Sequence, residues 1–411
     1  MGTAPEYRWY VGIDWGSEQH QVCIVDDTGR RSEQVVSHTG AGLAGLGAQL
    51  AALSPEAPAQ VVVALEVPRG PVVDVLLEHG VHVYAINPKQ LDRFRDRHTV
   101  AGAKDDRRDA FVLADAVRTD RPAFRRVHPD APEVVELREL SRLDDDLREE
   151  LGRLSNRLRA QLYRVAPELL ALCPAADEPW FWTLLERALL PRLPRVSLKA
   201  VKAVLKVHGI RRLTAETVHA TVQRPLLRSA PGTLDAVRAH LAVVLPRVRL
   251  VYDQRHRMVG RRIEALLTTL GQGPDHAEHR DVTILRSLPG VGRLVAATVL
   301  AEAAQALTTR DYQTLRAQAG VAPVTRQSGK RTVVSMRWAC HPRLRYAVYH
   351  WARVSVQVDA RCRAHYQHLR QAGHEHARAL RGVADRLLAI LMAMLARRTL
   401  YDPTRWTAHT S

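Results

Sequence analysis

Four acidic residues of this 411-residue chain stand where their carboxylates could bind metal ions. Asp14 follows an apolar, strand-like run, YVGI, and Glu66 follows a second one, VVVAL. Asp106 and Asp109 lie three residues apart in KDDRRDA, where a helix would place them on one face. Converging carboxylates repel one another unless cations neutralise them, and Mg²⁺ does so while activating the attacking and leaving oxygens of a phosphodiester. The pattern therefore predicts a site for two Mg²⁺ ions, with Mn²⁺ as a second choice, and Asp105 is a further candidate ligand.

A serine surrounded by cations is a candidate nucleophile. Ser328 lies in TRQSGKR, where Arg326, Lys330 and Arg331 flank it. Such cations would offset phosphate charge and help to deprotonate the hydroxyl, so that it could attack phosphorus. Taken alone, Ser328 is more simply a solvent-exposed loop serine, and Ser335, seven residues further on, is a competing assignment.

The segment LPGVG, residues 288–292, predicts a tight turn between two helices. In a helix-hairpin-helix unit, residues such as Gly290 and Gly292 let backbone N–H groups approach a DNA phosphate, and Arg293 would add positive charge. An ordinary interhelical turn explains the same residues without nucleic acid.

The charge of the chain points to a polyanionic partner. Sixty Lys and Arg stand against 43 Asp and Glu, a formal net charge of +17, and nucleic acid is the usual partner of so basic a protein. The four cysteines form no CxxC pair, and the histidines near residue 370 lack the Cys or acidic residues that would complete a zinc set. With no signal peptide and no membrane-length apolar run, we expect a bacterial cytoplasmic protein associated with the nucleoid and not with a membrane.

The elements that position the carboxylates follow from the periodicity of the first hundred residues. Three short strands are expected within 8–37, followed by a helix (40–53), a buried strand (61–67), a helix (71–79), a strand (81–87) and a helix from Pro88. The order β-β-β-α-β-α-β-α is that of the α/β ribonuclease-H-like fold. In such a sheet the strands before Asp14 and Glu66 are neighbours, so both carboxylates would lie at one rim.

The rest of the chain is predicted to be mostly helical. We expect a nuclease-like domain over 1–130, a long helix or coiled coil over 131–166, a helical linker region over 167–280 and a last domain over 281–411 that carries Ser328. In the long helix, a leucine stripe that includes Leu143 needs a partner helix, from this chain or from a second copy, and of the two we favour dimerisation through 134–165. Asp144 is assigned to the opposite, polar face.

These residues together resemble a known family, the insertion-sequence 110 transposases of the DEDD type, which have a RuvC-like nuclease domain. The resemblance covers nearly the full chain. At the N-terminus it rests on YVGIDWGSEQHQVCIVDDTGR, ALEVPRG and INPKQLDRFRDRHTVAGAKDDRRDAFVLADAVRTD, and at the C-terminus on LRSLPGVGRLVAATVLAE, LRAQAGVAPVTRQSGK and ALRGVADRLLAILMAML. The K-x-D-x-x-D-A string selects Asp106 and Asp109 over Asp105.

The resemblance implies more than the motifs do. Asp14, Glu66, Asp106 and Asp109 match the family's metal-binding tetrad, and Ser328 matches its nucleophilic serine, which would form a transient phosphoserine link to DNA. It also implies a noncoding bridge RNA that guides the enzyme to the element ends and the target DNA. A composite site of nuclease and serine domains is expected, in a homo-oligomer that is a dimer or a tetramer.

Three other interpretations stay open on the sequence. A Holliday-junction resolvase would need only the four carboxylates. An actin-like phosphotransferase would explain GIDWGS as a phosphate-binding turn, although a second such turn is missing. A non-enzymatic nucleic-acid-binding protein would rely on the LPGVG turn alone.

Overall fold

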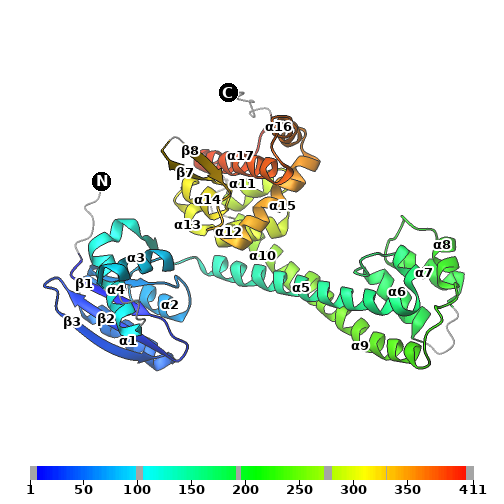
Figure 1. The fold of residues 1–411 in the computed structure, drawn as a ribbon, viewed down its shortest axis with the longest axis horizontal. Helices are drawn as coiled ribbons and strands as arrows, with labels where there is room; N and C mark the ends of the chain where they lie inside the picture. Colours follow the sequence, from blue (N-terminus) through cyan, green and yellow to red (C-terminus); the bar gives the residue numbers. More distant parts are fainter. Residues whose placement is uncertain (1–6, 99–104, 191–195, 273–279, 330, 404–411) are drawn as a thin grey trace. The chain divides into compact units, whose positions relative to one another are not determined.

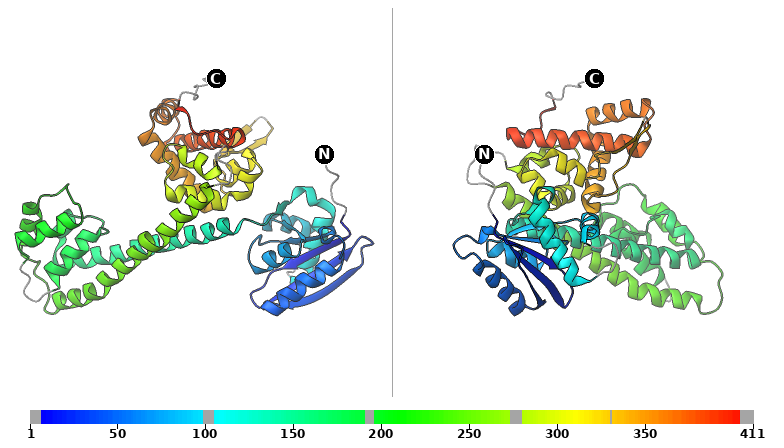
Figure 2. Two further views of the ribbon diagram at one scale, coloured as in Figure 1. Left: turned by 180° about the vertical axis from the view of Figure 1, so that it is seen from behind. Right: turned by 60° about the vertical axis from the view of Figure 1, so that its left-hand side comes forward.

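The computed structural model describes residues 7–98, 105–190, 196–272, 280–329 and 331–403. The chain forms two compact units, Met1–Asp130 and Ala131–Ser411. Figures 1 and 2 show a sheet with helices in the first unit and an almost wholly helical second unit.

The N-terminal unit is built on one mixed sheet of six strands, ordered β3-β2-β1-β4-β5-β6. The strands are β1 (Trp9–Asp14), β2 (Gln19–Asp26), β3 (Arg31–Ser37), β4 (Val61–Leu65), β5 (His82–Ala85) and β6 (Arg125–Val127). β1, β2 and β3 form an antiparallel meander, β4 and β5 run parallel to β1, and β6 is antiparallel to β5. This arrangement agrees with the ribonuclease-H-like prediction, to which the structure adds the short edge strand β6.

Helices cover both faces of this sheet. They are α1 (Gly40–Ala52), α2 (Pro71–Glu78), α3 (Pro88–His98) and α4 (Asp106–Asp120). Because side chains alternate along a strand, Val11 and Ile13 of β1 enter the core with α1 and α2, whereas Gly12 between them faces α4. Val62 and Ala64 of β4 likewise pack on the face that α3 and α4 cover. β4 is therefore buried on both sides, as its apolar sequence predicted, and the middle of β1 is buried in the same way.

The second unit holds two hydrophobic cores connected by one long helix, α5 (Pro132–Val165). The first core contains α6 (Pro179–Leu189), α7 (Leu198–Val207), α8 (Ala215–Val222) and α9 (Thr233–Asp253). The second contains α10 (Gly260–Gly271), α11 (Asp281–Ser287), α12 (Arg293–Glu302), α13 (Ala304–Thr308), α14 (Tyr312–Gln318), α15 (Pro342–Val358), α16 (Ala360–Gln371) and α17 (His376–Arg397). The mostly helical prediction for this part is confirmed.

The apolar side of α5 is covered from within the chain. α9, α10 and α12 pack along it, so the stripe has the intramolecular partner and gives no argument for a second copy. Two assignments on this helix were wrong: Leu143 is 43% exposed, whereas Asp144 is 2% exposed. Asp144 accepts hydrogen bonds at 3.0 and 3.2 Å from Arg255, which lies in the π-helical turn Gln254–Val259 between α9 and α10. Sequence periodicity could not show that a buried cation would compensate this acid.

The segment after α14, whose sequence fits either a loop or a short hairpin, forms a hairpin with strands β7 (Val324–Ser328) and β8 (Arg331–Ser335). Ser328 pairs with Arg331 across a two-residue turn, and Gly329 there has a φ of +56°. Such a short turn requires positive φ, which glycine adopts without steric cost. None of the described helices is both long enough and apolar enough to cross a membrane.

Candidate active site

The ends of β1 and β4 bring two of the predicted ligands side by side. The register of these parallel neighbours pairs Ile13 with Leu65. Asp14 and Glu66 are the next residue after each of these, so they lie side by side where both strands end. Both side chains are partly exposed. The expected adjacency of the two strands is confirmed, and it sets two carboxylates at one rim.

Helix α4 supplies the other two carboxylates from its first turn. Asp105 is the N-cap, and its side chain accepts a hydrogen bond from the Arg107 N–H at 3.2 Å. Asp106 is exposed, whereas Asp109 is only 1% exposed. Negative charge in the first turn of a helix is favoured by the helix dipole. Because Asp105 is used as a cap, the helix offers Asp106 and Asp109 as ligands.

A glycine in β1 lets α4 approach the sheet. A Cβ at Gly12 would lie 1.9 Å from the Ala110 carbonyl oxygen and 2.5 Å from the Ala114 nitrogen, which no side chain could tolerate. Helix backbone therefore lies directly on strand backbone two residues before Asp14. This close approach places Asp109, the neighbour of Ala110, at the end of the sheet that carries Asp14 and Glu66.

An arginine that the sequence analysis did not single out joins two of the carboxylates. Arg95 of α3 donates to Asp109 from Nε (to Oδ1, 2.6 Å) and from Nη2 (to Oδ2, 2.8 Å), and its Nη2 lies 3.7 Å from Glu66 Oε1. A third carboxylate, Asp92, accepts from Nη1 at 2.5 Å. The hydrogen bonds to Asp109 raise the pKa of Arg95, so its positive charge is held firmly. One arginine among several in RFRDRH carries no signal in sequence, because the contact joins residues fourteen apart on different helices.

The chemistry of these side chains suits a hard divalent cation. All four candidate ligands offer carboxylate oxygens, which Mg²⁺ and Mn²⁺ prefer, and the buried charge of Asp109 requires a cation nearby. Within the described parts of the chain, no three of these carboxylates bring oxygens within 4.8 Å of one another. Arg95 supplies the compensating positive charge between Asp109 and Glu66 instead.

The turn after Asp14 is held by a buried histidine that sequence reasoning also missed. His20 accepts a hydrogen bond from the Gly16 N–H at 3.3 Å, and its Nε2 lies 2.8 Å from Nδ1 of His38. Burial, and then the neighbouring His38, lower the pKa of His20, which favours the neutral ring that this acceptor role needs. Trp15 lies against both imidazole rings with half of its surface exposed.

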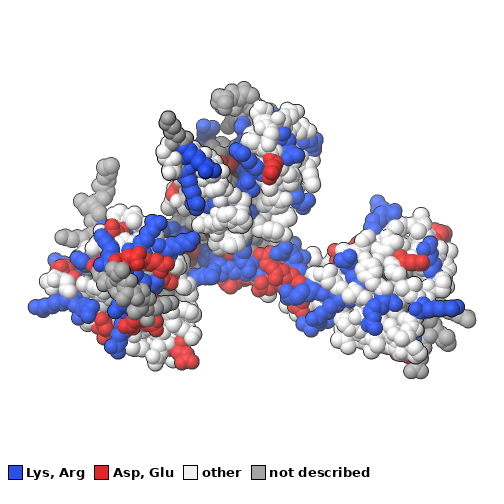
Figure 3. Space-filling model, viewed as in Figure 1, with Lys and Arg blue, Asp and Glu red and all other residues white. Residues whose placement is uncertain are grey.

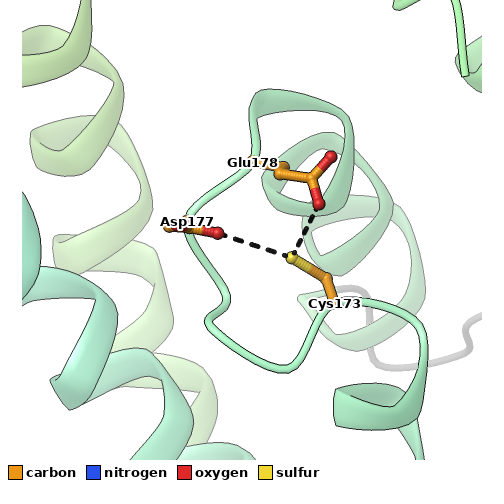
Figure 4. Close-up of side chains that lie close together, drawn as sticks. All are labelled: Cys173, Asp177 and Glu178. Carbon is orange, nitrogen blue, oxygen red and sulfur yellow. Dashed lines mark hydrogen bonds between the residues drawn. The ribbon is translucent and has the colours of Figure 1, made fainter. Parts of the chain in front are cut away.

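A second acidic cluster, at Cys173, Asp177 and Glu178, is explained by packing (Figure 4). The Cys173 thiol donates to Glu178 at 3.6 Å and to Asp177 at 3.9 Å. Burial raises the pKa of this thiol, so it stays protonated and is a poor metal ligand. Glu178 also accepts hydrogen bonds from Trp180 Nε1 at 2.8 Å and from Arg212. The cluster is an internal hydrogen-bond network at the start of α6.

The candidate nucleophile lies at the tip of an exposed hairpin, and Figure 3 shows basic side chains over this hairpin. Alternation along β7 puts Ser328 on the same face as Arg326, and the register puts Arg331 directly opposite Ser328. The Ser328 hydroxyl has no hydrogen-bond partner among the described residues, whereas the hydroxyl of Ser335 donates to the Val324 carbonyl at 3.4 Å. Lys330 lies outside the described residues.

The LPGVG turn joins α11 and α12 as expected, but its glycines differ in surroundings. Gly290 has a φ of +79°, and a Cβ there would lie 2.6 Å from Ser355 Oγ of α15. Close packing thus accounts for Gly290 without nucleic acid. Gly292 is exposed with open space around it, and Arg293 reaches toward Gly260. A phosphate contact from this turn stays a prediction.

Known proteins similar to this chain are transposases and insertion-element proteins. Residues 11–167 match a family model described as a transposase of the DEDD type found in IS110, and residues 282–367 match the model described as transposase IS116/IS110/IS902 family. A mini-circle protein of Streptomyces coelicolor, named as a transposase for IS117, is 31% identical over 414 residues, covering 96% of this chain and 96% of its own length. A Sinorhizobium fredii protein named as transposase y4uE is 46% identical over 217 residues, which are 52% of this chain and 60% of that protein.

A third relative is the 43.6 kDa protein of insertion element IS110 from Streptomyces coelicolor, which is 31% identical over 310 residues, or 73% of this chain and 72% of its own. The two family models lie on the carboxylate unit together with α5 and on the part of the chain that carries the hairpin. The chain therefore belongs to the IS116/IS110/IS902 family of transposases, enzymes that transfer phosphoryl groups of DNA.

Proposed function

We propose that this transposase exchanges DNA strands with two sets of residues, a RuvC-like metal site at Asp14, Glu66, Asp106 and Asp109 and a nucleophile at Ser328. The observation that carries the proposal is the convergence at one sheet rim, where two adjacent strand ends and the first turn of α4 meet. The family match supports a divalent metal. We favour two Mg²⁺ ions because every proposed ligand is a carboxylate.

A bound divalent cation would supply Lewis-acid stabilisation of charge on the phosphate oxygens. The chain's part is to hold the carboxylates in place. Gly12 sets the spacing of α4 on β1, His20 holds the turn after Asp14, and the cap at Asp105 sets where α4 begins. Arg95 and a metal ion would compete for the same oxygens of Asp109, since both are cations that need that carboxylate.

The proposed reaction of Ser328 conserves the phosphodiester. The serine oxygen forms a bond to phosphorus while the bond from phosphorus to one sugar oxygen breaks; the serine hydroxyl loses a proton and the freed sugar oxygen gains one. A hydroxyl of the incoming strand then attacks the phosphoserine and releases the serine. Arg326 and Arg331, which share a hairpin face with Ser328, would neutralise the charge on the phosphorane.

The resemblance to the family also suggests an RNA partner, an oligomeric state and a location in the cell. We propose that a noncoding bridge RNA guides the enzyme to element ends and target DNA, that the active form is a homo-oligomer, and that it works at the nucleoid in the bacterial cytoplasm. The net charge of +17 suits a protein that binds both RNA and DNA.

The serine is tested by a pair of single substitutions. Ser328→Ala is expected to abolish strand exchange and the covalent protein–DNA product that denaturing gels detect, since no oxygen is left to attack. Ser335→Ala is the matched control: it removes a hydroxyl from the same hairpin and should keep both. If Ser328→Ala cuts and joins DNA normally, the resolvase interpretation replaces this one; if only Ser335→Ala is inactive, the nucleophile has been misassigned.

A further inference from the structure

A cavity of about 310 Å³ lies beside the hairpin, between β8 and helix α17. Val334 and Ser335 of β8 line it on one side, and Arg378, Arg381 and Asp385 of α17 line it on the other. Its volume is that of a small-ligand site. All its lining residues belong to the second unit, so the cavity shares no residue with the carboxylate rim.

The acid that lines this cavity is already neutralised. Asp385 accepts hydrogen bonds from Tyr312 at 2.8 Å and from Arg316, in a two-point contact with the guanidinium. The guanidinium of Arg316 is therefore already paired with a carboxylate. The remaining lining cations, Arg337, Arg378 and Arg381, face the cavity with no carboxylate left to pair with them among the lining residues.

Arg378 and Arg381 also stand where positive charge is unfavourable. Both lie in the first two turns of α17, a 22-residue helix with no acidic residue in its first turn and no side-chain cap from Glu375. The N-terminal end of a helix carries partial positive charge and attracts anions. Neither arginine has an ion-pair partner within 4.0 Å in the described parts of the chain. Arg378 lies in the first turn, where the helix dipole disfavours a cation, and it also repels Arg381; the Glu375 carboxylate offsets part of the charge at Arg381.

Neighbouring guanidinium groups strengthen this positive field. Arg345 donates to the Arg337 carbonyl at 2.8 Å, which holds Arg337 at the cavity edge. Burial, and then the charges of Arg378 and Arg345, lower the pKa of Arg381. A guanidinium stays protonated despite such a shift, so Arg381 remains a cation with which an anionic ligand can pair.

We propose that this arginine cavity, lined by Arg337, Arg378 and Arg381, binds a phosphodiester group of a nucleic-acid strand next to the hairpin of Ser328. Guanidinium groups recognise phosphate through paired N–H donors, and the helix N-terminus adds its dipole. The binding site holds the strand and takes no part in bond breaking. The proposal rests on the proposed function only in taking the ligand to be nucleic acid.

The test is the salt dependence of binding by the full chain. Fluorescence anisotropy with a labelled duplex DNA is measured from low to moderate salt for wild type and for Arg378→Gln/Arg381→Gln. Losing one phosphate contact should weaken binding several-fold and reduce the slope of log K against log salt by about 1. The control is Arg397→Gln, an exposed arginine at the other end of the same helix, which should keep the wild-type slope.

Two further measurements identify the nucleic acid that binds and test whether the arginines are structural. An RNA duplex of equal length assigns the source of the phosphate: a reduced slope for DNA alone identifies a DNA strand, and for RNA alone a guide strand. Unchanged slopes with both overturn the proposal, as does an equal loss in Arg397→Gln. The melting temperature of the double variant should equal or exceed that of wild type, because repulsion is removed; a fall would make the arginines structural and also overturn it.

Strand exchange at saturating DNA separates this proposal from the catalytic one. The double variant should retain exchange there, since it keeps Ser328 and the four carboxylates. A reduced slope with retained exchange supports the arginine cavity whatever is found for the nucleophile. Abolished exchange at saturating DNA, with an unchanged slope, would contradict a role in holding the strand.

Discussion

Asp109 differs from the other three carboxylates in being almost completely buried. Removing a carboxylate from water is costly unless a cation and hydrogen bonds compensate it, and Arg95 supplies both through its two bonds to Asp109. Asp106, one helical turn earlier on the same face, is exposed and needs no such compensation. Substitutions of the two aspartates should therefore have the same effect on catalysis and different effects on stability.

Asp109→Asn and Asp106→Asn are both expected to abolish strand exchange, because each removes a charged ligand. Asp109→Asn should also lower the free energy of unfolding by about 2–3 kcal/mol, since Arg95 loses its charged partner. Asp106→Asn should stay within about 0.5 kcal/mol of wild type, as surface substitutions do. Urea unfolding followed by circular dichroism measures both, and equal stabilities would show that the Arg95 contact contributes little.

Arg95→Gln tests the competition between the guanidinium and the metal. Removing the cation should free oxygens of Asp109 and Glu66, so the full chain should bind Mn²⁺ several-fold more tightly in isothermal titration calorimetry. Arg97→Gln is the matched control, because Arg97 lies on the same helix and pairs with Asp120 at 3.0 Å, away from the rim. Weaker Mn²⁺ binding in Arg95→Gln would mean that Arg95 organises the ligands and does not compete with the ion.

At the scale of elements, the site depends on one close contact between a strand and a helix. β1 carries Asp14 and α4 carries Asp109, and the absence of a side chain at Gly12 lets the two backbones touch. A larger residue would push α4 outward and move two ligands away from the other two. The packing of one residue thus controls the geometry of all four carboxylates.

Gly12→Ala is expected to lower the free energy of unfolding by more than about 2 kcal/mol and to weaken metal binding, because backbone atoms cannot give way as side chains do. Gly45→Ala in α1 is the control: it faces open space, and alanine should stabilise a helix by about 0.5–1 kcal/mol. Thermal unfolding of the two variants measures the difference. A Gly12→Ala protein as stable as wild type would show that α4 can shift without cost.

At the scale of the whole molecule, each unit has hydrophobic cores of its own. The cores of the sheet unit draw on residues between Tyr7 and Val127, and those of the helical unit on residues between Leu137 and Tyr401. A domain of about 130 residues is of the usual size for independent folding. The carboxylate unit should therefore not need the rest of the chain to fold.

Residues 1–130 expressed alone are expected to unfold in one cooperative transition and to bind Mn²⁺, since all four proposed ligands lie within them. Circular dichroism during heating and titration calorimetry check the two statements. The same fragment with Glu66→Gln should fold equally and bind the ion more weakly. A fragment without a cooperative transition would show that this unit depends on the helical one.

The sequence by itself determined the chain order of the first five strands, the strand ends that bear Asp14 and Glu66 and the helical nature of most of the rest, because each depends on local periodicity and turn chemistry. It left the segment around Ser328 as a loop or a short hairpin, and it did not predict β6. The sequence also identified the family, because the motifs that resemble it are contiguous segments of the chain. Only the tertiary structure decided the partner of the α5 stripe, the burial of Asp144 against Arg255, the place of Arg95 among the carboxylates and the arginine cavity beside β8. These contacts join residues far apart in the chain or on separate elements, and the burial that makes a charge costly and fixes its partner exists only once the elements are packed.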